Sequence, residues 1–419
     1  MEQRQLSPAQ VTAIDGRWPT MRVVVSSDSR YARTPDGRVW TWQVPDYPVW
    51  RRYLTAFDKV RVVARVCDQP EVSADALRVD GEGVEVWPLP YYIGPWQYLR
   101  CRSSIIDVLA DASGPTDAVI VRVPSFLGSH LARIRRQRRL PYAAEVVADP
   151  YDVLAPGVLQ PPLRPLLRHR CTARLRHECR TAVGVSYVTE SYLQARYPCA
   201  PGAPTAAISS IDLVDDAFVP APRSIVRQPA EAVLMSAGTM EQLYKGIDTL
   251  IEALARLRAA GLDVRLVHLG TGRLQHQLEK LVADRGVIDR VTFAGWIQPG
   301  APLRAKLDEA DLFVMPSRTE GLPRALLDAM ARALPAIGTN VGGIPELLPA
   351  EDLVDPDDPA ALASAIAAML AAPERMAAAS ARNLSRARQF SRTCLDPRRT
   401  AFYQAVRDAT ASRTACHAG

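Results

Sequence analysis

Residues 317–331 read Ser-Arg-Thr-Glu-Gly-Leu-Pro-Arg-Ala-Leu-Leu-Asp-Ala-Met-Ala and follow the apolar run 312–315. This pattern predicts a buried strand, a glycine turn and the first turns of a helix. Pro323 suits the first helical position, where its missing N–H is not needed. The turn then directs free backbone N–H groups at the sheet edge, which favours an anion. Glu320 and Asp328 flank those amides and suit the hydroxyl groups of a sugar nucleotide, although an ordinary strand–turn–helix unit has the same pattern.

The composition indicates a globular protein with more than one domain. The chain has 419 residues, of which 48% are hydrophobic and 23% are charged, and this length exceeds one typical domain. No apolar run of about 18 residues occurs, so no transmembrane helix is predicted. The first residues lack the apolar core of a signal peptide. Seven cysteines without a C-x2-C pair predict reduced thiols in a cytoplasmic protein and no metal site.

Short apolar runs alternate with helical segments in two series. The first series comprises residues 21–25, 60–66, 118–123, 144–147 and 184–188, and the second comprises 233–238, 264–269, 291–293, 312–315 and 336–338. This alternation predicts an α/β protein with two Rossmann-like domains and a central cleft. A stretch rich in proline and charge, at 215–229, is the predicted linker. We therefore expect an N-terminal domain at 1–220 and a second domain at 221–395.

The segment that contains Glu320 resembles the E-x7-E motif of glycosyltransferase family 4, whose members are retaining enzymes with the GT-B fold. Asp328 stands at the position of the second Glu. The resemblance implies that Glu320 is a catalytic residue that binds a hydroxyl of the donor sugar, and that Asp328 binds the ribose. It also implies that a C-terminal helix, at about 396–419, crosses back onto the first domain. Donor binding is expected as well from the turn residues Gly321, Leu322, Pro323 and Arg324.

A second loop, at 238–246, follows the first strand of the second domain and resembles the family's G-R-…-K-G segment. Lys245 matches the lysine that neutralises the diphosphate, so we expect it to bind the donor and to be catalytic. Thr239 stands where the family has arginine, and Arg324 is a candidate for the missing charge, because negative charge grows on the diphosphate as the glycosidic bond breaks. Further expected donor-binding residues are Gly238, Gly270 and Trp296. For the last two, a simple turn and packing on the sheet are the alternatives.

The loop after the first strand is the expected acceptor side. Such enzymes use a glycine-containing loop at this place, and the candidates here are Asp28, Gly37 and Arg38. An Asp-Gly pair is also an ordinary turn signal, so a purely structural role is the alternative.

Two further residues of the first domain are candidate catalytic groups. Many family members carry a His-Asp pair at the end of a middle strand, and here Ala148 and Asp149 stand in its place. Asp149 is a candidate base toward the acceptor, with a helix cap as the alternative. His130 is expected to face the cleft, although a lone histidine is more often a packed or surface residue.

The net charge is +6, and nearly all of the positive charge comes from arginine. Two arginine clusters, at 133–139 and 164–180, are the candidate membrane-docking surface, because related enzymes with lipid acceptors dock basic helices on anionic membranes. A solvated face in an arginine-rich chain is the interpretation that the composition favours. Nucleic acid is not an expected partner, because no aromatic platform or nucleic-acid motif accompanies the charge.

The sequence thus predicts a retaining, metal-independent glycosyltransferase without a cofactor. Its donor is a nucleoside diphosphate sugar with UDP or GDP, and its expected acceptor is a small molecule of bacterial natural-product biosynthesis. One alternative is polysaccharide or lipid-linked glycan assembly at the membrane. Another is a sugar-nucleotide-binding protein without activity, since the family pattern is changed at Thr239, Asp328 and Ala148.

Overall fold

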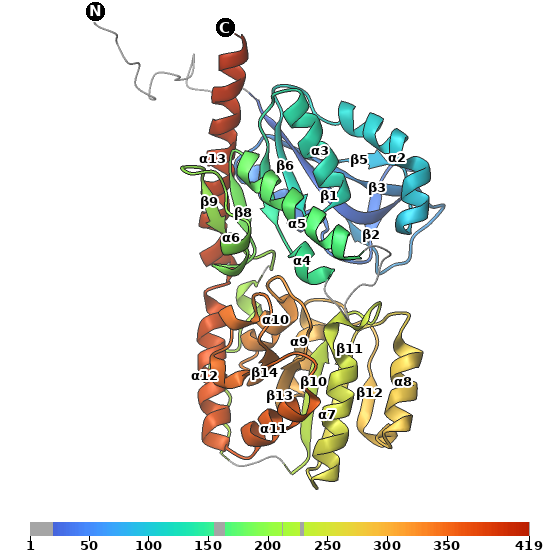
Figure 1. Ribbon diagram of the computed structural model, residues 1–419, viewed down its shortest axis with the longest axis vertical. Coiled ribbons are helices and arrows are strands. Elements are labelled where there is room, and N and C mark those ends of the chain that lie inside the picture. Colours follow the sequence, from blue (N-terminus) through green and yellow to red (C-terminus); the bar gives the residue numbers. More distant parts are fainter. Residues whose placement is uncertain (1–19, 155–163, 212, 227–229, 419) are drawn as a thin grey trace, which may run out of the picture.

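The computed structural model describes residues 20–154, 164–211, 213–226 and 230–418, which form two α/β units stacked along the long axis of the molecule (Figure 1). Each unit is built on its own sheet. The segment between β9 and β10 connects the two units, and the predicted boundary near residue 220 falls within it.

Seven parallel strands form the first sheet, in the order β5-β3-β1-β6-β7-β8-β9, and β2 and β4 extend it by antiparallel pairing. The central strand β6 is buried at five of its six positions, as expected where helices cover both faces of a parallel sheet. The strands are β1 (Arg22–Arg33), β2 (Val39–Thr41), β3 (Lys59–Asp68), β4 (Leu77–Arg78), β5 (Val84–Leu89), β6 (Ala118–Val123), β7 (Ala143–Val146), β8 (Val185–Tyr187) and β9 (Thr205–Ala207).

Six parallel strands form the second sheet, in the order β12-β11-β10-β13-β14-β15. Its strand β13 is buried at all four positions. The strands are β10 (Ala232–Ala237), β11 (Val264–Leu269), β12 (Val291–Phe293), β13 (Leu312–Met315), β14 (Ala336–Thr339) and β15 (Leu353–Val354).

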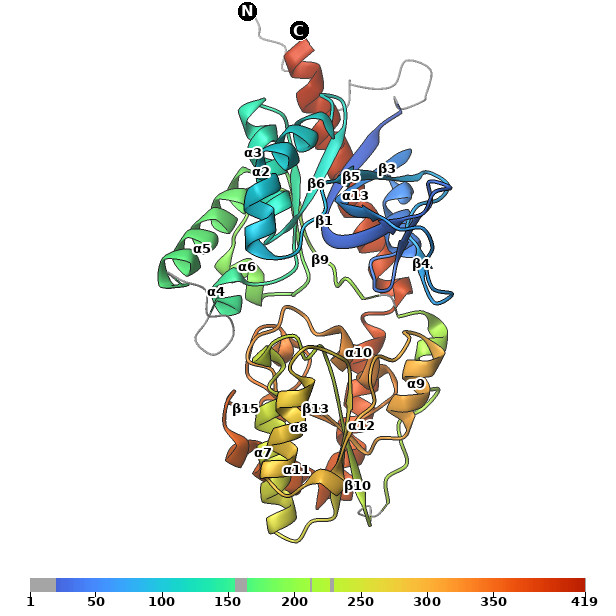
Figure 2. The same cartoon turned by 90° about the vertical axis from the view of Figure 1, so that its right-hand side faces the viewer.

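Helices connect the strands and cover both sheets (Figures 1 and 2). Those of the first unit are α1 (Tyr47–Arg51), α2 (Gly94–Asp111), α3 (Phe126–Gln137), α4 (Pro150–Val153), α5 (Arg164–Thr181) and α6 (Tyr192–Arg196). Those that follow are α7 (Ile247–Ala259), α8 (Gln275–Asp284), α9 (Ala301–Asp308), α10 (Arg324–Ala331), α11 (Pro359–Leu370), α12 (Pro373–Arg388) and α13 (Arg392–Ala418).

The C-terminal helix α13 returns from the second unit and packs along the first (Figure 1). The ring of Tyr403 stacks on Tyr53 with 4.5 Å between centroids. Arg407 donates hydrogen bonds to the carbonyl oxygen of Ala56 and, at 3.1 Å, to the carboxylate of Asp58. The predicted α/β class, the two Rossmann-like sheets and the crossing helix are confirmed, and the helix begins at Arg392, slightly earlier than expected.

No single helix in the described ranges is both long and apolar enough to cross a membrane. The pair α11 and α12 passes by length and composition taken together, with a bend of 99° between the two helices. Their apolar side chains contribute to the core of the second unit.

Candidate active site

A cavity of about 1080 Å³ lies between the two units, at the carboxyl ends of their strands. This is the edge where parallel α/β sheets bind ligands. The second unit lines it with the loop after β10 and the turn between β13 and α10. Nine of the residues that were predicted to bind the donor line the cavity: Gly238, Thr239, Lys245, Glu320, Gly321, Leu322, Pro323, Arg324 and Asp328.

A buried ion pair joins the loop after β10, which contains Lys245, to the loop after β13, which contains Glu320. Lys245 Nζ lies 2.6 Å from Glu320 Oε1, and their side chains are only 17% and 9% exposed. The hydroxyl of Ser317 donates a second hydrogen bond to the same carboxylate oxygen, at 2.7 Å. Burial acts to lower the pKa of Lys245, but the charge of Glu320, the hydrogen bond to it and the neighbouring Tyr244 together outweigh burial, so the pKa of Lys245 lies above its ordinary value. Lys245 is therefore charged at neutral pH.

Backbone packing fixes the loop that carries Lys245. Gly246 has a φ of +66°, and a Cβ there would overlap the carbonyl oxygen of Pro316. The amide of Arg318 donates to the carbonyl of Tyr244 at 2.7 Å. The guanidinium of Arg318 also binds both carboxylate oxygens of Asp248, at 2.9 and 2.8 Å. Glycine is thus required at residue 246. The bidentate ion pair between Arg318 and Asp248 holds the segment that follows β13 against helix α7.

A buried histidine holds the loop that begins at Gly238. His268 is fully buried, with Nδ1 2.8 Å from the hydroxyl of Ser236 and Nε2 3.0 Å from the carbonyl oxygen of Gly238. Because that carbonyl only accepts, Nε2 donates to it and Nδ1 accepts from Ser236. Burial lowers the pKa of His268 to about 4, so the ring is neutral. Gly270 packs against Gly238 so closely that a Cβ on it would overlap the Gly238 carbonyl oxygen.

The turn that follows Glu320 begins helix α10 inside the cavity. Pro323 is the residue before the helix, with φ of −74° and ψ of 113°, and α10 starts at Arg324, one residue later than predicted. Asp328, one turn into the helix, also lines the cavity. Burial raises the pKa of Asp328 to about 7, although Arg324 and Arg304 oppose the shift.

Arginines of both units meet at this end of the cavity. Arg324 and Arg52 line it from opposite units. Burial lowers the pKa of Arg324, and the charges of Arg122 and Arg52 lower it further, although Asp328 opposes them. Mutual repulsion among guanidinium groups marks a place where a negative group is stabilised.

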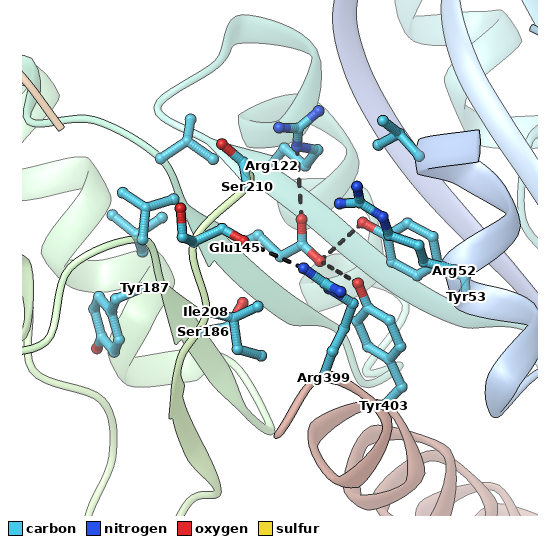
Figure 3. A pocket seen from close by; sticks show the side chains of 15 residues that line it. Arg52, Tyr53, Arg122, Glu145, Ser186, Tyr187, Ile208, Ser210, Arg399 and Tyr403 are labelled. Carbon is cyan, nitrogen blue, oxygen red and sulfur yellow. Dashed lines mark hydrogen bonds and ion pairs between the residues drawn. The ribbon is translucent and has the colours of Figure 1, made fainter. Parts of the chain in front are cut away.

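A small recess of about 40 Å³ adjoins the cavity behind Arg52 (Figure 3). The carboxylate of Glu145 lies at its centre. Tyr53 donates a hydrogen bond to it at 2.8 Å, Tyr403 of helix α13 does so at 3.4 Å, and Arg122 lies 3.6 Å away. Helix α13 therefore contributes directly to the lining of this recess.

Two predicted catalytic residues lie away from the cavity. Asp149 is buried, and its carboxylate accepts hydrogen bonds from the amide of Tyr151, at 2.8 Å, and from Tyr197 and Arg196. It caps helix α4, which was the alternative interpretation. His130 lies on α3, with Nε2 2.7 Å from the hydroxyl of Tyr98. Neither residue is among the described residues that line the cavity.

The predicted acceptor-side residues also lie elsewhere. Gly37 and Arg38 belong to the turn between β1 and β2, where the amide of Gly37 donates to Thr34. Neither they nor Asp28 are among the described residues that line the cavity. The first unit instead lines it with a segment that the sequence analysis did not single out: Gln43, Val44, Asp46, Pro48, Val49 and Arg52. Sequence offered little signal for this segment, because it is an irregular loop and a short helix.

Two predicted donor-side residues are outside the cavity as well. Trp296 is 42% exposed, and Gly270 acts through its packing on Gly238. Within the described ranges, neither lines the cavity.

A glycine-rich loop at 341–346 connects the turn between β13 and α10 to the first unit. Gly342 has a φ of +55°, and a Cβ there would overlap the Glu320 carbonyl oxygen, while the amide of Gly343 donates to the Gly321 carbonyl at 2.8 Å. At the end of the loop, the Glu346 carboxylate accepts three backbone N–H groups of the first unit, at 2.6 to 2.9 Å, and the Ser191 hydroxyl at 3.0 Å. These amides begin helix α6, so Glu346 acts as an inter-domain helix cap.

Gly321 packs closely against the first unit. A Cβ on Gly321 would lie 2.5 Å from the carbonyl oxygen of Val147 in the first unit. The turn between β13 and α10 therefore contacts Val147, the residue after β7, and only glycine fits at this contact.

Comparisons with known proteins agree with this arrangement. Residues 231–372 match the family model described as Glycosyl transferases group 1. The chain is 27% identical over 320 residues to protein CapJ of Staphylococcus aureus, covering 74% of this chain and 77% of CapJ. It is 34% identical over 171 residues to the putative colanic acid biosynthesis glycosyltransferase WcaL of Escherichia coli, covering 39% of this chain and 41% of WcaL.

A solved structure shares the fold over nearly the whole chain. Anabaena HepE, in complex with UDP and glucose, matches with a TM-score of 0.61 and 16% identity, covering 90% of this chain and 97% of HepE. At that identity the match shows a common fold, which is the predicted GT-B arrangement of two parallel-sheet domains.

Replacement of Glu346 by Ala should loosen the two units relative to each other. The change removes the acceptor of three N–H groups at the start of α6, and such charge-assisted contacts contribute about 1–3 kcal/mol. We expect a lower midpoint of thermal unfolding and a larger radius of gyration by X-ray scattering. Glu351→Ala is the matched control, because the Glu351 side chain is 65% exposed. If both variants behaved like the wild type, the contact would not hold the units together.

Proposed function

We propose that the protein, whose residues 231–372 match the family model described as Glycosyl transferases group 1, transfers a sugar from a nucleoside diphosphate sugar to a growing bacterial glycan. The observation that carries the proposal is the pairing of Lys245 with Glu320 beside the start of α10, inside the cavity between the two units. This geometry provides cations and amides for a diphosphate next to a carboxylate for a sugar.

The charges favour departure of a diphosphate. As the bond from the anomeric carbon to the diphosphate oxygen breaks, negative charge grows on that oxygen. Lys245, Arg324 and the free N–H groups at the start of α10 stabilise it. These groups supply the positive charge that a divalent cation supplies in other enzymes, so we propose a metal-independent reaction. Thr239, at the family's arginine position, contributes at most a neutral hydrogen bond.

The remaining carboxylates position the donor. Glu320 accepts a hydrogen bond from a sugar hydroxyl, and Ser317 together with Lys245 keeps its carboxylate oriented. Asp328 accepts from the ribose hydroxyls. UDP and GDP are the proposed leaving nucleotides, and HepE, which has the same fold, was crystallised in complex with UDP and glucose.

Retention of configuration at the anomeric carbon fits the part of the first unit that lines the cavity. Asp149, the candidate base, and His130, the other candidate catalytic residue of the first unit, bind other residues and do not line the cavity. In the proposed step the acceptor oxygen bonds to the anomeric carbon on the face that the diphosphate leaves. The acceptor proton passes to the departing diphosphate oxygen, so no protein base is required.

A glycan acceptor is proposed in place of the small natural product that the composition suggested. WcaL is described as a putative colanic acid biosynthesis glycosyltransferase, and another relative, 32% identical over 211 residues, is described as a mannosyltransferase acting on phosphatidylinositol monomannoside. Polysaccharide or lipid-linked glycan assembly, the alternative from the sequence, is thus the class that relatives support.

The direct test is turnover of UDP-glucose and GDP-mannose, measured as release of the nucleoside diphosphate with glycan acceptors and with water. Glu320→Gln should lower kcat by about 100-fold, because it removes a charged contact to the reacting sugar. Glu241→Gln is the matched control, since Glu241 lines the same cavity but is exposed, and it should retain wild-type turnover. Full turnover by Glu320→Gln would contradict the site assignment.

Donor binding should strengthen as pH rises through about 7. The pKa of Asp328 is raised to about 7, so its carboxylate is mostly protonated at pH 6 and ionised at pH 8, and the ionised form accepts hydroxyl groups better. The affinity for the nucleotide sugar should therefore rise roughly tenfold between these pH values. Calorimetric titration with UDP-glucose or GDP-mannose measures this, because their diphosphates do not titrate in that range. Asp328→Asn should abolish the pH dependence, and an equal rise in that variant would contradict the assignment.

A further inference from the structure

A row of three polar side chains crosses the sheet of the first unit. Arg122 of β6 pairs in register with Glu145 of β7, and Glu145 pairs with Ser186 of β8. Residues in register on neighbouring strands point to the same face of a sheet, and all three side chains line the small recess (Figure 3). The other residues of β6 and β7 are alanine, valine or isoleucine. The row therefore interrupts an otherwise apolar part of the sheet.

The carboxylate of this row has hydrogen-bond partners, but the donors of the row do not. Glu145 accepts from the hydroxyls of Tyr53 and Tyr403. The guanidinium of Arg122 forms an ion pair with Glu145 at 3.6 Å and makes no hydrogen bond within the described residues, although its side chain is only 22% exposed and its Nε is buried. The hydroxyl of Ser186, which is 5% exposed, also has no partner among them. Because buried donors normally have a partner, these two indicate that a group from outside the chain binds here.

The charges around the recess favour an anion. Among the described residues, three arginines line it, Arg52, Arg122 and Arg399, together with the carboxylate of Glu145. Arg399 is paired with Asp396, and Arg52 has an interaction of its own. Of the three, Arg122 thus has N–H groups available for a ligand. A carboxylate or a phosphate matches such N–H and O–H donors, because its oxygens accept hydrogen bonds and carry negative charge.

The recess opens into the large cavity beside the turn between β13 and α10. Val147 and Val188 line both spaces. A Cβ on Gly321 would lie 2.5 Å from the carbonyl oxygen of Val147 and 3.4 Å from a methyl carbon of Val188. Glu320 precedes Gly321, so the recess lies next to the position that the proposed function gives to the reacting sugar. Its volume of about 40 Å³ admits one small polar group but no sugar ring.

We propose that Arg122 and Ser186 form a subsite for an oxyanion, a carboxylate or a phosphate, that one of the two sugar substrates carries. The identity of those substrates rests on the proposed function. The oxyanion accepts hydrogen bonds from the Arg122 guanidinium and the Ser186 hydroxyl, while Glu145 stays paired with the two tyrosines. Uronic acids carry the first of these groups and sugar phosphates the second, so the subsite selects charged sugars over neutral ones.

Inorganic phosphate is the probe for this subsite. Thermal unfolding is followed at increasing phosphate, with millimolar UDP and GDP to fill the proposed diphosphate site and with sodium chloride to hold the ionic strength constant. The wild-type midpoint should rise with phosphate along a saturating curve. Arg122→Gln and Ser186→Ala should each lower the apparent affinity by about tenfold, because each removes donors to a charged group.

Matched controls separate the subsite from general effects on the fold. Arg265→Gln removes a strand arginine that also forms an ion pair, at 3.5 Å to Glu231. Ser113→Ala removes a buried hydroxyl that also has no partner among the described residues. Neither residue lines the described walls of the recess, so both variants should bind phosphate as the wild type does. Arg122→Lys keeps the positive charge and should recover part of the affinity.

Unfolding midpoints without phosphate show whether each variant folds. Ser186→Ala keeps the test valid if Arg122→Gln does not fold, because it removes only a hydroxyl that has no partner in the described chain.

The affinities of paired donors identify the substrate that carries the oxyanion. Calorimetric titration compares UDP-glucuronic acid with UDP-glucose, and GDP-mannuronic acid with GDP-mannose. If the transferred sugar carries the oxyanion, the wild type binds the uronic acid donor more tightly, and Arg122→Gln removes the preference. Equal affinity within the pair that binds would place the oxyanion on the acceptor.

The subsite and the proposed function fail in different ways. Absence of binding by all four donors would contradict the proposed function, whereas phosphate binding that depends on Arg122 would still support the subsite. Phosphate bound in the diphosphate site would depend on Lys245 instead. A loss of phosphate binding in Lys245→Ala with none in Arg122→Gln would therefore overturn the proposal. So would the absence of a saturating rise in the wild type, or wild-type affinity in both Arg122→Gln and Ser186→Ala.

Discussion

The ion pair between Lys245 and Glu320 is the contact on which the rest of the site depends. It joins two loops that leave adjacent strands, β10 and β13, and it lies where little water reaches it. A buried ion pair of this kind is stable only when both partners are held in place. Here Ser317 holds Glu320, while the turn at Gly246 and the ion pair of Arg318 with Asp248 fix the lysine loop. The surrounding structure therefore keeps two opposite charges at the lining of the cavity, where the proposed function has them contact a diphosphate and a sugar hydroxyl.

The two halves of the site are built by different domains, and a few contacts between them set its shape. The glycine-rich loop at 341–346 packs against the turn between β13 and α10, and its Glu346 caps helix α6 of the first unit. Gly321 meets Val147 directly. On the far side, helix α13 brings Tyr403 to Glu145, behind the wall that carries Arg52. Domain position and site geometry are thus coupled through hydrogen bonds and close backbone packing, together with a hydrophobic cluster that includes buried residues of both units.

The sequence predicted those parts of the molecule that depend on residues close together in the chain. The two parallel sheets follow from apolar runs that alternate with helices, and the predicted donor-binding residues that line the cavity lie in two strand–loop–helix segments that are continuous in sequence. The predicted acceptor-side residues and Asp149 do not line the cavity, because the contacts that place them are distant in sequence. Asp149 faces Tyr197 and Arg196, which lie nearly fifty residues further along, so it caps a helix instead of lining the cavity. Likewise, the segment from Gln43 to Arg52, an irregular loop followed by the short helix α1, reaches the cavity only through the packing of the first unit.

The central claim is that the cavity between the two units binds a nucleoside diphosphate through Lys245 and the start of α10. Thermal unfolding in the presence of millimolar UDP, GDP, ADP or TDP tests it most directly, because a ligand present at about 100 times its Kd stabilises the folded state by about 2.7 kcal/mol. The account predicts that one of the four nucleotides raises the unfolding midpoint and that Lys245→Ala removes the rise. No rise with any of the four, or an equal rise in Lys245→Ala, would contradict it.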